Sequence, residues 1–97
     1  MQIAHQPRLI EKENIPGLSF PEEDVLAVKT DQNQRRKDLL NANELGDLAQ
    51  YKVKILFEDA SASYKVETTV WNTTPKDVVL KYGIKIPIHR VSRVYFP

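Results

Sequence analysis

The chain has 97 residues, no cysteine and a formal net charge of +1. This length favours one domain, and the lack of cysteine excludes a disulfide framework, a cysteine-ligated zinc site and a thiol nucleophile. Met1 to Ile10 lacks the apolar core of a signal peptide, and no stretch approaches the roughly 18 apolar residues of a membrane span. We therefore expect a cytoplasmic protein without membrane contact.

Residues 1–30 predict an N-terminal arm that is partly disordered. Prolines interrupt it at Pro7, Pro16 and Pro21, and its apolar residues are scattered. Pro21 is followed by three acidic residues, a pattern typical of a helix start. We expect the arm to dock its apolar side chains on the rest of the domain or on another subunit.

Residues 31–48 predict a short helix. Asp31 is a good N-cap with Gln34 three positions later, as in a capping box, and Gly46 is a plausible C-terminal stop. Three consecutive cations lie in the first turns: Arg35, Arg36 and Lys37. They form either a solvated helix face or part of a binding surface.

From Tyr51 the apolar period changes to 2, which predicts strands with one buried face each. The five predicted strands cover residues 51–58, 64–71, 78–82, 84–89 and 94–96, with one helical turn at 89–92. Pro87 cannot donate to a ladder, so we expect it at an edge or bulge. Such short strands favour a mainly β fold with a short N-terminal helix, in which residues 31–97 form a small five-stranded curved antiparallel sheet or open barrel, SH3-like or Sm-like.

The last strand and the turn before it carry a family resemblance. His89-Arg90-Val91-Ser92, followed by a strand that ends in Pro97, resembles the His-Ala-Ile-Ser motif and terminal strand of the bacterial Sm-like RNA chaperone. Asp38–Ala42 and Val78–Lys81 also resemble their counterparts, so the likeness covers roughly residues 38–97. Pro87-Ile88 replaces the Tyr-Lys pair of that family, and the glycine of its second strand is missing from Tyr64–Thr68.

This resemblance implies an Sm-like fold, assembly of copies through edge strands, and RNA as the partner. The same order of elements also resembles the Rof-like inhibitors of the transcription termination factor Rho. That second likeness implies a protein partner instead, because a shared fold does not fix a function.

The sequence does not predict an enzyme, a cofactor or a metal site. Its two histidines, His5 and His89, are far apart in the chain and form no metal-binding motif. Three glycines supply no phosphate-binding loop, and the serines lack a nucleophile elbow.

The charge is distributed unevenly. Residues 51–97 hold 8 Lys/Arg and 4 Asp/Glu, whereas residues 1–50 hold 6 and 9. Either the two halves are simply decorated differently, or the second half carries a basic face for an anionic partner.

We therefore carry two hypotheses. The first is binding of RNA or another single-stranded nucleic acid, in which an outward tryptophan among the lysines of the strands is the stacking platform. Its candidate residues are Arg35, Arg36, Lys37, Trp71, His89, Arg90 and Arg93. Trp71 has an alternative interpretation as a core or interface residue, since large aromatic side chains are mostly buried. The second hypothesis is a protein-interaction module, or a homo-oligomer, that docks by strand addition.

Overall fold

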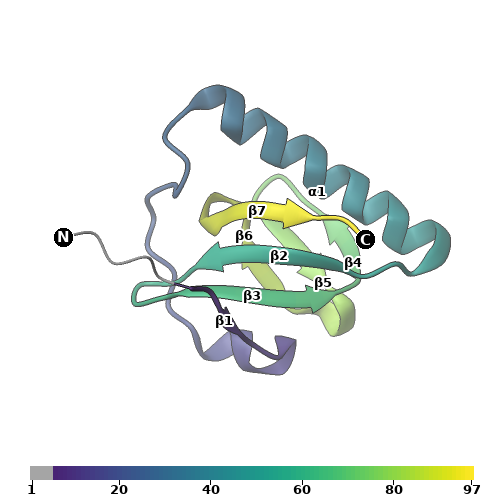
Figure 1. Cartoon of the computed structure of the whole chain (residues 1–97), viewed down its shortest axis with the longest axis horizontal. Helices are drawn as coiled ribbons and strands as arrows, with labels where there is room; N and C mark the ends of the chain where they lie inside the picture. The colour runs from purple at the N-terminus through teal and green to yellow at the C-terminus, as the bar shows by residue number, and fades with distance from the viewer. Residues whose placement is uncertain (1–5) are drawn as a thin grey trace.

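A computed structural model describes residues 6–97, so residues 1–5 of the expected arm lie outside the described residues. Figure 1 shows two sheets with one long helix beside them. One sheet has the strand order β1-β3-β2-β7 and the other β4-β5-β6. The strands are β1 (Arg8–Leu9), β2 (Val53–Glu58), β3 (Ser63–Thr68), β4 (Val70–Thr73), β5 (Asp77–Leu80), β6 (Lys85–Pro87) and β7 (Val91–Tyr95).

The mainly β class with one helix is confirmed for residues 6–97. The five-stranded sheet is not confirmed, because seven strands form a four-stranded and a three-stranded sheet that do not close into a barrel. The additional strands have two origins. β1 comes from the arm, and the second predicted strand divides into β3 and β4.

The helix α1 spans Lys29–Ala49 and is longer at both ends than expected. It begins ahead of Asp31, which lies in its first turn and is not the N-cap. Gly46 does not end the helix, which continues until Gln50 turns left-handed at φ 57°. Gly46 is instead a point of close approach, because a Cβ there would collide with the carbonyl oxygen of Val70 in β4.

The alternation of β2 is confirmed, since Val53, Ile55 and Phe57 are buried and the residues between them are more exposed. The alternation of the next strand fails at Thr69, which is buried together with both of its neighbours. This single residue separates β3 from β4 and takes the chain from one sheet to the other.

The later strands are shifted from their predicted positions. β5 stops at Leu80 because Lys81–Gly83 form a 3-10 turn, η2, in place of the predicted strand end. A second 3-10 turn, η3, covers Ile88–Arg90, and β7 therefore begins at Val91. Pro87 lies in β6, an outer strand of its sheet, as its missing N–H requires.

Residues 6–28 lie against the rest of the domain. β1 pairs in parallel with β3, and a 3-10 helix, η1 (Lys12–Gly17), buries Ile15 completely in the core. Pro21 begins no helix, since the chain bends there without forming one, and the Val25 amide donates to the His89 carbonyl. The core is thus formed by both sheets together with α1 and η1.

Candidate nucleic-acid interface

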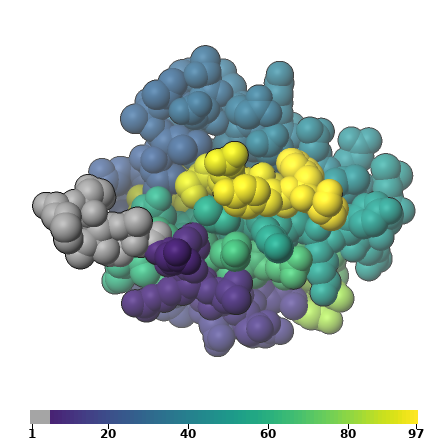
Figure 2. Space-filling view, in the orientation of Figure 1, coloured from purple at the N-terminus to yellow at the C-terminus, as the bar shows by residue number. Residues whose placement is uncertain are grey.

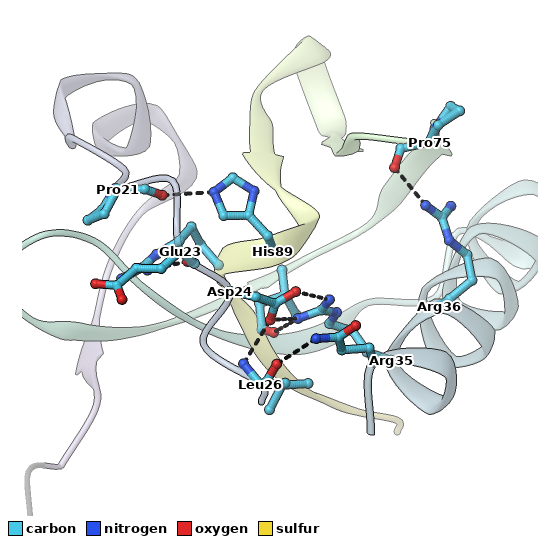
Figure 3. Close-up of polar contacts among 11 residues, drawn as sticks. Pro21, Glu23, Asp24, Leu26, Arg35, Arg36, Pro75 and His89 are labelled. Carbon is cyan, nitrogen blue, oxygen red and sulfur yellow. Dashed lines mark hydrogen bonds and ion pairs between the residues drawn. The ribbon is translucent and has the colours of Figure 1, made fainter. Parts of the chain in front are cut away.

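Arg35 projects from the first half of α1 into the interior and is 7% exposed. Its Nη1 and Nη2 atoms donate to the two carboxylate oxygens of Asp24, each at 2.8 Å (Figure 3). Nη1 also donates to the Val91 carbonyl at 3.1 Å. The hydrogen bond from Arg35 holds the pKa of Asp24 below its ordinary value. Arg35 therefore fastens the arm and β7 to the helix, and its guanidinium does not face solvent.

Arg36 and Arg90 also direct their guanidinium groups to the protein's own backbone. Arg36 donates to the carbonyls of Thr74 and Pro75 at 3.0 and 2.7 Å. Arg90 is 6% exposed and donates to the carbonyl of Glu23 at 2.7 Å and to two further carbonyls at the end of β2. Carbonyl groups do not neutralise a charge, but they take up the donors that would otherwise bind phosphate.

The histidine and the lysine of the predicted set lie apart. The His89 side chain is half-buried, and its Nε2 lies 2.8 Å from the carbonyl oxygen of Pro21 (Figure 3). Lys37 is exposed on α1. The seven predicted residues thus do not form one surface, because three arginines and His89 hold the domain together.

The outer face of the four-stranded sheet brings Arg93 and three lysines together with aromatic side chains. Two rows of residues cross β3, β2 and β7 on this face, as the strand register defines. They are Lys65–Leu56–Arg93 and Glu67–Lys54–Tyr95. Figure 2 views the molecule from the side on which these strands lie in front.

This face is mostly basic. Its cations are Lys52, Lys54, Lys65 and Arg93, and none of them forms an ion pair with a described residue. The Arg93 guanidinium lies 5.0 Å from the centre of the Tyr95 ring, and Tyr95 and Phe96 are each 41% exposed. A shallow depression of about 580 Å³ lies among the three lysines, Glu67, Tyr95 and Phe96.

Trp71 lies in the other sheet, in β4, and is 47% exposed. It is therefore not a core residue. Its ring meets that of Tyr82 at a centroid distance of 5.8 Å and an angle of 71°, and Tyr82 is 66% exposed. The two rings form a second exposed aromatic group, to which we refer as the aromatic corner.

Sequence reasoning identified the strand lysines, Arg93 and Trp71 but missed the aromatic partners. Tyr95 and Phe96 appeared only as residues of the last strand, although Tyr95 shares the solvent-facing phase of that strand with Arg93. The predicted strand 78–82 contains Tyr82, but β5 ends at Leu80. The alternation of the last strand therefore predicts an exposed Tyr95 beside Arg93. No pattern in the neighbouring sequence predicts the contact between Tyr82 and Trp71.

No group of three His, Asp or Glu side chains in residues 6–97 is placed to hold a metal ion. Within the same residues, no helix has the length and apolar character that crossing a bilayer requires. Neither a family model, nor a curated protein, nor a solved structure matches the chain.

Proposed function

We propose that this protein binds single-stranded nucleic acid on the outer face of its four-stranded sheet. The observation that carries the proposal is the combination on this face of the exposed rings of Tyr95 and Phe96 with four cations that have no ion pair within residues 6–97. Cations attract the phosphates of a strand and aromatic rings stack on its bases. Among the described residues, Glu67 is the one acidic side chain that lines the depression between them.

The aromatic side chains favour a single strand over a duplex. Bases in a duplex are stacked on one another and present only their edges, whereas unpaired bases offer a face to a ring such as Tyr95. A guanidinium already lying over a ring, as Arg93 lies over Tyr95, extends the flat surface available for stacking.

The order of the strands supports the likeness to Sm-like proteins as part of the proposal. If β3 and β4, which only Thr69 separates, are taken as one bent strand, the antiparallel pairings run β7-β2-β3/β4-β5-β6. We propose that this order is that of an SH3-like or Sm-like open barrel whose bent strand serves both sheets. The bend occurs without the glycine of the resembled family.

The test is a titration of fluorescein-labelled oligouridine RNA, about 12 nucleotides long, followed by anisotropy at about 50 mM salt. We expect Lys54→Ala and Lys65→Ala each to weaken binding several-fold while leaving the fold intact by circular dichroism. Lys29→Ala is the matched control, because it removes an exposed lysine at the start of α1 that does not line the depression. The proposal fails if the protein does not bind at this salt, or if Lys29→Ala weakens binding as much as Lys54→Ala.

A second candidate function, a protein-interaction module, rests on an apolar groove that adjoins the depression and shares Phe96 with it. Leu48 is 77% exposed on α1 and lines a groove of about 470 Å³ with Leu45 and Phe96. Exposed apolar side chains that line one groove favour a protein partner or a second copy of the chain. Sedimentation at several protein concentrations tests the second copy. A strict monomer would count against self-assembly, and loss of self-association in Leu48→Ser would support it.

A further inference from the structure

The aromatic corner is built by two residues on either side of β5 that are exposed despite their size. Trp71 comes from β4 and Tyr82 from η2, and the edge-to-face contact between their rings is the geometry that aromatic pairs prefer. Both rings remain largely open to solvent. The pair therefore contributes little to the core, and its exposure calls for another explanation.

The backbone of Tyr82 has the conformation that L residues avoid. Its φ is 69° and its ψ is 16°, and the next residue, Gly83, is also left-handed with φ 80°. Two hydrogen bonds hold the turn in place, from the Leu80 amide to the Ile84 carbonyl and from the Lys81 amide to the Thr69 carbonyl. A bulky residue at positive φ costs free energy, and a ring that is 66% exposed recovers little of it by burial. The turn thus presents the tyrosine ring at the expense of local stability.

Two ammonium groups lie beside this ring. The Nζ atoms of Lys12 and Lys81 are 5.4 and 5.3 Å from the centre of the Tyr82 ring. Lys12 also lies 3.7 Å from a carboxylate oxygen of Glu13, whereas Lys81 forms no ion pair with a described residue. The corner therefore joins an exposed indole with a local excess of positive charge.

We propose that the aromatic corner is a second nucleotide-binding site, in which Trp71 stacks on a base and Lys12 and Lys81 bind the adjoining phosphate. Both ammonium groups already contact the Tyr82 ring, so we assign the stacking on a base to Trp71. The edge-to-face contact with Tyr82 then fixes the orientation of the indole. This inference rests on the proposed function and extends it, since one strand would then contact both the outer sheet face and the corner.

The chain supplies its own reporter for this site, because Trp71 is the one tryptophan in the sequence. A base stacked on the indole quenches its fluorescence, whereas binding confined to the outer sheet face leaves the indole in solvent. The experiment titrates the full chain with unlabelled oligouridine of about 12 nucleotides while recording tryptophan emission. Anisotropy of the labelled RNA is measured in parallel under the same conditions.

We expect quenching and anisotropy to follow one binding curve. Trp71→Ala should weaken binding about tenfold, the scale of a lost base–aromatic stack. Lys81→Gln should weaken RNA binding less and should reduce the salt dependence of binding. This variant keeps Trp71 as a reporter. Lys29→Ala is again the matched control and should change neither signal.

The outcomes separate this inference from the proposed function. RNA that binds by anisotropy without quenching Trp71, and that binds Trp71→Ala as tightly as the parent, overturns the second site and leaves the outer sheet face intact. An absence of binding by either signal at low salt overturns the proposed function and the inference with it. A shift of Trp71 emission that depends on protein concentration and not on RNA overturns the inference in favour of a contact between copies.

Discussion

The ion pair between Asp24 and Arg35 offers the clearest test of how the N-terminal segment is held. The perturbation is Asp24→Asn, which keeps the shape of the side chain and removes its charge. The Asn oxygen can still accept from the Leu26 amide, which donates to Asp24 at 2.7 Å. The amide nitrogen, however, cannot accept from the guanidinium, so Arg35 is left as a buried and uncompensated cation.

The expected cost follows from the burial of the pair. Removing one partner of a buried ion pair costs about 3–5 kcal/mol, whereas exposed pairs contribute about 0–1 kcal/mol. The Arg35 side chain is 7% exposed and that of Asp24 is 27% exposed, so water reaches the carboxylate. We therefore expect Asp24→Asn to lower the free energy of unfolding by about 2 kcal/mol, which for a domain of this size lowers the Tm by roughly 8–16 °C.

The same pair predicts a pH dependence of known sign. The pKa of Asp24 in the folded protein lies below its ordinary value of 3.8, because the carboxylate accepts hydrogen bonds from Arg35. A depressed pKa contributes stability that is complete above the ordinary value and is lost as the pH falls through the folded one. The difference between the parent and Asp24→Asn should thus be constant near neutral pH and shrink below about pH 4.

Urea unfolding of both proteins at several pH values measures this difference. Asp47→Asn is the matched control, because Asp47 is exposed on α1 and its loss should change stability by less than about 0.5 kcal/mol. A cost of Asp24→Asn no larger than that of the control near neutral pH would show that the ion pair does not hold the N-terminal segment. A cost that stays the same below the pH at which Asp24 is protonated would show the same.

Three further predictions concern the binding surfaces and the helix. In the anisotropy assay, Lys54→Ala and Lys65→Ala should each lower the slope of log Kd against log salt by about 0.7, the value of one phosphate contact to a single strand. An unchanged slope would exclude that contact. Tyr82→Asn should leave the urea midpoint nearly unchanged, because relief of the left-handed strain, about 1 kcal/mol, offsets the lost aromatic contact. Gly46→Ala should destabilise by about 1–3 kcal/mol in the same assay, since the new Cβ collides with a backbone oxygen of β4; a stabilised variant would contradict that close approach.

The elements that the sequence predicts well are those that depend on local patterns. The alternation of Val53, Ile55 and Phe57 identifies β2 and its buried face, because the two faces of a strand alternate with period 2. A helix over 31–48 is confirmed within α1, although Asp31 and Gly46 are not its ends, and Pro87 is found on an outer strand. Each of these follows from backbone chemistry within a few residues.

The elements that it misses depend on contacts between distant parts of the chain. Gly46 resembles a helix stop, and its role as a point of close approach is defined by Val70 in β4. Thr69 is buried along with both neighbours, so alternation gives no sign that the strand divides there. Arg8 and Leu9 form β1 only because the edge of β3 is available to them.

The sequence predicts the cations of the candidate site but not which of them face solvent, because that depends on contacts between distant parts of the chain. In the sequence Arg35, Arg90 and Arg93 are equivalent cations. In the fold, the groups that each one contacts determine whether its guanidinium is available to a ligand. Arg35 and Arg90 bind groups from segments that are remote in sequence, and Arg93 lies over Tyr95 on the solvent side. No local pattern distinguishes a guanidinium that braces the fold from one that is free to meet a ligand.

The excess of positive charge that the sequence shows in residues 51–97 lies on the surface of the folded domain. Of the cations in residues 51–97, Arg90 alone is buried, and the others keep at least part of their side chains in solvent. The excess of positive charge in this half is therefore available to an anionic partner. Because the bracing arginines and the exposed lysines are different residues, substitutions such as Lys54→Ala should change binding without changing stability, whereas Asp24→Asn should do the reverse.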